Sequence, residues 1–130
     1  LELTEDTELL KTSLALIKDD PCIQDAWLAK DREALLLCSQ PLFEKNRSTN
    51  DITHFYFHKL DRVNFLRVHN PPYYGDIIDR HTMATAYQSH QISVGKELGL
   101  FGILTLRVVQ PWYIQDELVG CTSSKVSDRS

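Results

Sequence analysis

Apolar residues in the first part of the chain recur at helical spacing. From about Thr4 to Lys18, the residues Leu10, Leu14 and Ile17 repeat every three or four positions, as on one side of an amphipathic helix. An apolar stripe of this kind needs another apolar surface to pack against. The pattern therefore predicts a long N-terminal helix that covers a second layer of structure.

Prolines interrupt the helical pattern at two places. Asp20 precedes Pro21, and a residue before proline is disfavoured in helical conformation, whereas proline itself suits a first helical turn. The pattern then predicts a second helix from about Pro21 to Ser39, which Pro41 bends or ends. A polar cluster follows, so we expect helical structure to stop near residue 46.

Beyond that point the apolar pattern changes to a period of two, which is typical of β-strands. A helix is predicted from about Asp79 to Ser89, inside this second part of the chain. The order of elements indicates an antiparallel α+β fold with helices gathered on the faces of the sheet. The predicted strands are Ile52–His58, Phe65–His69, Ile92–Lys96, Ile103–Val109 and Glu117–Cys121.

Three of these strands each divide into a purely apolar side and a chemically mixed side. Successive side chains of a strand point to opposite faces of the sheet. We expect the N-terminal helices to cover the apolar face, which comprises Phe55, Phe57, Leu66, Val68, Leu104 and Leu106. The mixed face comprises His54, Tyr56, Arg67, His69, Thr105 and Arg107.

The mixed face allows more than one interpretation. One face of an antiparallel sheet is often exposed to solvent, in which case these side chains are ordinary surface groups. Alternatively, the segment Asn70–Gln91, which supplies tyrosines, covers the face and encloses a pocket. Covered cations would then need an anion, either Asp76, Asp79 or Glu97 within the protein or the carboxylate of a ligand. An internal partner predicts that Arg67→Ala unfolds the protein, and a ligand partner predicts that it does not.

Composition narrows the classes of function. The 130 residues carry a net charge of -4, and 42% of them are hydrophobic, which is typical of one globular domain. No basic stripe is present and the sequence pI is about 5.7, so nucleic-acid binding is disfavoured. The chain starts at Leu1 without methionine and has no apolar run near eighteen residues. We therefore expect neither a signal peptide nor a membrane span, and we interpret the chain as a segment of a longer protein.

Cysteines and histidines give no metal or redox signature. Cys22, Cys38 and Cys121 lack CxxC spacing, their odd number cannot pair completely, and they fix no compartment, so we expect small buried groups. His54 and His58 share a face, but four residues along a strand separate them by about 13 Å, too far for one metal ion. A two-histidine site would need His54 beside a histidine of the neighbouring strand. Catalytic or metal chemistry is therefore disfavoured.

A family resemblance is carried by longer motifs that cover roughly residues 30–120. The motifs are THFYFHKLDRVNFLRVHNPPYYGDIIDRHTMATA, GKELGLFGILTLRVVQPWY and DELVG. Together they resemble the Cache-type, PAS-like extracytoplasmic sensor domains of bacterial chemoreceptors, sensor histidine kinases and diguanylate cyclases, in particular the double-sensory-domain group. The resemblance implies a long N-terminal helix, a five-stranded antiparallel sheet and a helical loop segment over a small-molecule pocket. The residues that it places at the pocket are Tyr56, Arg67, His69, Tyr73, Arg80, Thr105, Arg107 and His54.

The resemblance also implies a function. Such a domain binds a small organic anion, an amino acid or a similar metabolite, catalyses no reaction, and signals through its N-terminal helix in the periplasm as part of a membrane-anchored, homodimeric receptor. We expect no cofactor, since the CxxCH motif of covalent haem attachment is absent. A module that binds haem without covalent attachment, or that only dimerises, remains the alternative.

The end of the chain departs from the family pattern. After Gly120 the family continues with an aromatic-rich strand, whereas this chain turns polar from Cys121 to Lys125. We therefore expect one domain made of a helical segment over residues 1–46, a sensory sheet over 47–121 and a polar tail over 122–130.

Overall fold

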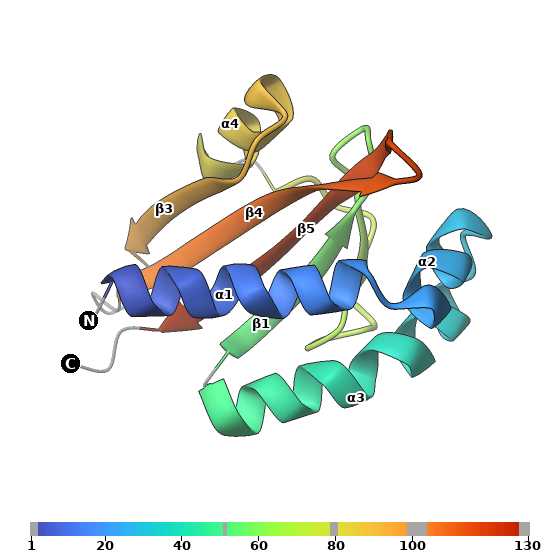
Figure 1. Cartoon of the computed structure of the whole chain (residues 1–130), viewed down its shortest axis with the longest axis horizontal. Coiled ribbons are helices and arrows are strands. Elements are labelled where there is room, and N and C mark those ends of the chain that lie inside the picture. Colours follow the sequence, from blue (N-terminus) through green and yellow to red (C-terminus); the bar gives the residue numbers. More distant parts are fainter. Residues whose placement is uncertain (1–2, 51, 79–80, 99–103, 128–130) are drawn as a thin grey trace.

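Four helices and a five-stranded antiparallel sheet make up the structure (Figure 1). The computed structural model describes residues 3–50, 52–78, 81–98 and 104–127. The strand order across the sheet is β2-β1-β5-β4-β3, so the last strand lies in the middle. The predicted α+β class and the antiparallel sheet are confirmed. The elements are α1 Leu3–Lys18, α2 Pro21–Leu28, α3 Arg32–Asn50, β1 Ile52–His58, β2 Asn64–Arg67, α4 His81–Ser89, β3 Ser93–Leu98, β4 Leu104–Ile114 and β5 Glu117–Ser127.

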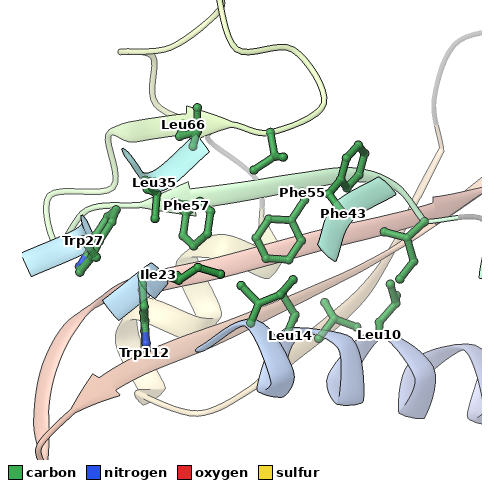
Figure 2. Close-up of a cluster of buried hydrophobic side chains, with 14 of the residues drawn as sticks. Leu10, Leu14, Ile23, Trp27, Leu35, Phe43, Phe55, Phe57, Leu66 and Trp112 are labelled. Carbon is green, nitrogen blue, oxygen red and sulfur yellow. The ribbon is translucent and has the colours of Figure 1, made fainter. Parts of the chain in front are cut away.

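The N-terminal helices cover the apolar face of the sheet, as predicted. In Figure 1, α1 runs across the sheet in front of β4 and β5, and it packs against both strands. Figure 2 shows the resulting core, in which aromatic side chains of β1 and β4 meet aliphatic side chains of the helices. Phe55, Phe57, Leu66, Val68 and Leu106 are all buried there. The side chain of Leu104, also predicted for this face, lies outside the described residues.

The helix predicted from Pro21 to Ser39 is two helices. The chain leaves helical conformation at Lys30, whose φ is 52°, and α3 begins at Arg32 with an Asp31 carboxylate oxygen accepting from the backbone N–H of Ala34. The start at Pro21 is correct, because Asp20 caps the backbone N–H of Ile23. The prediction of one continuous helix from Pro21 to Ser39 is wrong.

Pro41 does not end α3, which continues to Asn50 rather than to residue 46. Pro41 lies on the exposed side of this helix, where a carbonyl that loses its N–H donor has access to water. A proline in a long amphipathic helix is therefore tolerated here because the tertiary packing of the other side holds the helix.

The prediction of a polar tail over residues 122–130 is wrong for residues 122–127. These residues continue β5, which pairs with β1 on one side and β4 on the other. Thr122, Ser123 and Ser124 are fully buried despite their polar composition. Pairing of the backbone on both sides, rather than apolar side chains, keeps this strand in the sheet.

Two of the three cysteines form a disulfide. Cys22 of α2 is bonded to Cys38 of α3, with the Cα atoms 5.8 Å apart. The expectation of small buried groups holds for Cys121, which is buried and unpaired, and is wrong for Cys22, which is exposed. Among the described residues, no helix has the length and apolar character needed to cross a membrane.

Candidate functional site

A cavity of about 360 Å³ opens on the mixed face of the sheet. Its floor comes from three neighbouring strands, β2, β1 and β5, with β4 next to them. Strand register explains the convergence, since Tyr56 is paired with Arg67, and Arg107 is paired with Lys125. The residues that line the cavity are Tyr56, Arg67, Asp76, Ile77, Ile78, Arg107 and Lys125.

Arg67 is bound by an internal carboxylate. Its Nη1 and Nη2 each lie 2.7 Å from a different carboxylate oxygen of Asp76, and Nη1 also donates to the carbonyl of Tyr73. These hydrogen bonds raise the pKa of Arg67 and lower the pKa of Asp76. The rings of Tyr73 and Tyr56 flank the guanidinium at 3.8 and 5.4 Å. Of the two partners considered for Arg67, the structure contains the internal one.

A tight turn positions Asp76 opposite Arg67. Gly75 has a φ of 93°, a conformation that favours glycine, and its N–H donates to the carbonyl of Asn64. The N–H of Asn64 in turn donates to the carbonyl of Asp76, and Val63 forms an isolated antiparallel bridge with Ile77. The segment after β2 is thus held along the edge of the sheet with its carboxylate facing inward.

Arg107 lies at the other side of the Tyr56 ring and is almost completely buried, at 1% exposure. Its guanidinium carbon is 5.1 Å from the ring centre, and its Nη1 is 3.5 Å from the hydroxyl of Ser123. The same hydroxyl hydrogen-bonds with Nε2 of His58 at 2.7 Å. Tyr56 is 4% exposed and Arg67 is 7% exposed, so the interpretation of this face as a solvent-exposed surface is wrong.

Three histidines contact the ring of Tyr56 and are uncharged at neutral pH. Burial is the main cause that lowers the pKa of His54 and His58 to about 3 and that of His69 to about 4. The cations Arg67 and Arg107 lower all three further, which indicates a positive potential over this half of the mixed face.

The two histidines of neighbouring strands do lie together. The rings of His54 and His69 are 4.5 Å apart, and Nδ1 of His69 accepts from the backbone N–H of Phe55. Among the described residues, however, no group of three or more His, Cys, Asp or Glu could hold a metal ion. The arrangement therefore resembles ring packing more than a metal centre.

The other half of the mixed face is covered by α4. Met83 and Ala86 of this helix pack on Val109 and Cys121 of the sheet. A Cβ atom at Gly95 would collide with the hydroxyl of Thr82, so glycine is required for the close approach of α4 to β3. This half has an apolar core of its own, whereas the half next to it contains the cavity.

The structure brings together some of the pocket residues that were predicted from the sequence. Tyr56, Arg67 and Arg107 line the cavity, while His54 stacks on Tyr56 and His69 contacts the Tyr56 ring edge-on. Tyr73 packs on Arg67 and is 53% exposed. Thr105 lies opposite Glu97 and Ser127 in the sheet, away from the cavity lining, and Arg80 lies outside the described residues.

Four lining residues are absent from that set. Asp76 was considered only as an internal counter-ion, and Lys125 was assigned to the polar tail. The signal for Lys125 is its position in register with Arg107, which becomes visible only once β5 is known to be a central strand. The remaining two are Ile77 and Ile78.

Comparison with known proteins establishes the fold. No protein-family model and no curated protein sequence matches the chain. Solved structures do match, including the extracellular domain of vpHK1S-Z8, described as a histidine kinase, with a TM-score of 0.76 and 18% identity over 95% of this chain. The Escherichia coli DcuS sensor domain matches with a TM-score of 0.69 and 18% identity over 93% of this chain. The sensory domain of the Campylobacter jejuni chemoreceptor Tlp3, solved with isoleucine bound, matches with a TM-score of 0.63 and 11% identity over 95% of this chain.

These structures differ in how much of them the chain covers. It spans about half the length of the vpHK1S-Z8 and Tlp3 domains, at 53% and 51%, and 90% of the DcuS domain. The chain thus has the fold of extracytoplasmic sensor domains of kinases and chemoreceptors, and the predicted resemblance to Cache-type domains is confirmed at the level of the fold.

Proposed function

We propose that the chain is an extracytoplasmic, ligand-binding sensor domain of a bacterial transmembrane receptor of the chemoreceptor or sensor-kinase type. It binds a small organic anion or an amino-acid-like metabolite in the mixed-face cavity and catalyses no reaction. The observation that carries this proposal is the convergence of Arg67, Arg107 and Lys125 around the ring of Tyr56 in one cavity.

The chemistry of the cavity favours a carboxylate. Among the described lining residues, three are cationic and one, Asp76, is acidic. Guanidinium groups bind carboxylates with directional, charge-assisted hydrogen bonds. A volume of about 360 Å³ is at the small end of ligand pockets, which suits a metabolite rather than a peptide.

Two observations support an extracytoplasmic location. The matched vpHK1S-Z8 structure is described as the extracellular domain of a histidine kinase, and the DcuS and Tlp3 structures are described as sensor domains. The Cys22–Cys38 disulfide is expected in an oxidising compartment such as the periplasm and is rare in the cytosol.

The packing of α1 supports a route for the signal. This helix contacts β4 and β5 on the apolar face, and the same two strands present Arg107 and Lys125 to the cavity on the mixed face. A ligand that shifts these strands would therefore shift α1. Leu9 and Leu16 are exposed on α1 and supply an apolar surface for homodimerisation through the N-terminal helices.

A thermal-shift screen of carboxylates and amino acids tests the binding proposal. A ligand at one hundred times its dissociation constant should add about 2.7 kcal/mol to the free energy of unfolding. We expect at least one compound to bind, and Arg107→Lys and Lys125→Met to weaken its binding by about tenfold or more, since the first replaces a planar guanidinium fork by a point charge and the second removes a charge.

Lys96→Ala is the matched control. Lys96 is exposed and lies in register with Leu106, so it belongs to the apolar-face side of β3. Its removal should leave ligand binding unchanged. Failure of every carboxylate and amino acid to bind would contradict the ligand class, and binding that is insensitive to both cavity variants would contradict the site.

A further inference from the structure

Arg67 and Asp76 pair as a guanidinium pairs with a free carboxylate. Two nitrogens face two oxygens, each at 2.7 Å. A bidentate ligand carboxylate would use the same two donors. Both residues line the cavity, so a ligand there reaches the Arg67 fork only in competition with Asp76.

Up to Ile77, the segment that carries Asp76 buries little apolar surface. Tyr73, Tyr74 and Ile77 are each more than half exposed, at 53%, 55% and 57%. The backbone hydrogen bonds between this segment and Asn64 add to the attachment. Ile78 packs, partly buried, against the apolar cluster under α4, and Val63 forms a bridge with Ile77. The ion pair is therefore one of several attachments of the end of the segment, and it is the one that an external carboxylate can compete with.

The beginning of the same segment is fixed to the helical layer. Arg32 of α3 donates to the carbonyls of Phe65 and Pro71. Its guanidinium also stacks on the ring of Tyr74 at 3.7 Å. The segment thus has an anchored beginning, a glycine at position 75 with positive φ, and an end held by a charge pair.

We infer that Asp76 is an internal occupant of an anion site on Arg67, and that an external carboxylate displaces it and releases residues 75–78 from the sheet. The inference rests on the proposed function, because it requires the cavity to admit a carboxylate. The exchange replaces one ion pair by another and breaks no covalent bond. Asp76 then sets the threshold concentration at which simple carboxylates reach Arg67.

Acetate rescue of Asp76→Ala tests this inference. The variant removes the internal carboxylate, so its melting temperature in sodium chloride should fall below that of the wild type. Sodium acetate at the same ionic strength should raise it saturably. The apparent dissociation constant for acetate should be lower than that of the wild type by about tenfold or more, because a competing bidentate pair is gone.

Two further variants keep the test decisive. Arg67→Met combined with Asp76→Ala should lose the acetate response, since the fork itself is removed. If Asp76→Ala does not fold, Asp76→Asn, which keeps the size of the side chain, takes its place. An equal acetate response in the wild type and the Asp76 variant, or a response that persists without Arg67, would overturn the inference.

Hydrogen exchange separates release of the segment from simple filling of the site. In Asp76→Ala, the amide of Gly75 should exchange faster than in the wild type, and acetate should restore the melting temperature without restoring this protection. Free acetate is not tethered to the segment, so it fills the fork without holding residues 75–78. Restored protection at Gly75 would overturn the release step.

The outcome also separates this inference from the proposed function. Acetate rescue depends on Arg67, whereas the ligand screen is read through Arg107 and Lys125. A screened ligand that binds while acetate fails to rescue contradicts only the masking by Asp76. Rescue by acetate with no hit for the wild type in the screen contradicts the proposed ligand class and the displacement of Asp76 by a carboxylate, and it leaves only the anion site on Arg67.

Discussion

The two faces of the sheet are built from the same strands and differ in what covers them. On the apolar face, Phe55 and Phe57 pack under helices over most of the sheet (Figure 2). On the mixed face, Tyr56 alternates with them along β1 and meets two guanidiniums and a cavity. The period of two lets one strand supply core packing and a polar site at adjacent positions. We therefore expect stability and ligand response to be separable by mutation.

The largest expected effect is the loss of Trp27 from the apolar core. Its ring centre lies 5.1 Å from that of Trp112 and 6.0 Å from that of Phe57, and its Nε1 donates to the carbonyl of Val119. Trp27→Ala should lower the free energy of unfolding by about 3–5 kcal/mol, because it leaves a cavity and an unpaired carbonyl. Urea denaturation measures this value.

Leu37→Ala is the control for that experiment, since Leu37 is 74% exposed on a neighbouring helix. Its effect should stay within about 0.5 kcal/mol. A cost for Trp27→Ala no larger than that of a mixed-face variant would remove the distinction between the two faces.

Removal of the disulfide should be the next largest effect. Cys22→Ala with Cys38→Ala opens a link across 16 residues of sequence separation, and chain-entropy estimates for such a loop are about 3 kcal/mol. The midpoint of urea denaturation should fall. When Asp76→Ala is added to the disulfide-free protein, the acetate response described above should be kept. Loss of that response in the disulfide-free protein would show that the helical layer and the cavity are not separable.

Arg67→Met should cost less stability but abolish binding at the fork. The side chain of Arg67 is 8% exposed and that of Asp76 is 26% exposed, so the variant leaves a partly buried carboxylate without its partner. We expect a loss of about 1–3 kcal/mol. The sequence also allowed a ligand carboxylate to be the partner of Arg67. In that case, removal of Arg67 would leave the fold intact and would not expose an internal carboxylate.

A double-mutant cycle with Asp76→Asn measures the coupling between the two side chains. The combined variant should cost less than the sum of the single variants, since each single variant leaves one charge without its partner and the combined variant leaves none. Additive costs would mean that the pair contributes nothing to stability.

The smallest expected effect is the share of His58 in the loss of stability between pH 7 and 6. The imidazole of His58 has a pKa near 6.5 when unfolded and about 3 when folded. The unfolded chain therefore binds more protons below pH 6.5, and stability falls as the pH falls from 6.5 towards 3. His58 should contribute about 0.7 kcal/mol to the loss between pH 7 and 6, and His54 and His69, whose pKa values are also lowered, should each add about as much. Urea denaturation of the wild type and of His58→Gln at each pH measures the contribution of His58.

His58→Gln should remove about one third of this pH dependence, because an amide does not titrate in the window while His54 and His69 still do. His90→Asn is the control, since His90 is exposed and asparagine tolerates its φ of 58°. A folded-state titration of His58 near pH 6.5 in an NMR experiment would contradict the expectation.

The alternation of side chains was predictable from the sequence, because it depends only on the geometry of a strand. It correctly placed Phe55 and Phe57 in the core and Tyr56, Arg67 and Arg107 together on the other face. The helix start at Pro21 was equally local, since the capping carboxylate and the proline are adjacent in sequence.

The missed features depend on contacts that are distant in the sequence. At the break between α2 and α3, the capping residue Asp31 is a local sign, but the left-handed conformation of Lys30 is not typical of lysine and was not predictable from its neighbours. The central position of β5 is fixed by backbone pairing with β1 and β4, which the polar residues Thr122 to Lys125 do not reveal. Likewise, the choice of Asp76 as the partner of Arg67 depends on the turn at Gly75.

The location of the indole rings determines which spectroscopic signal suits each question. Both tryptophans of the chain, Trp27 and Trp112, are buried in the apolar core, and neither lines the cavity. Indole emission should therefore follow melting of the helix-covered layer and respond little to occupancy of the cavity. Tyr56 and Tyr73 are the nearby native chromophores, so a tyrosine-sensitive method such as near-ultraviolet circular dichroism is the better optical choice for ligand titration.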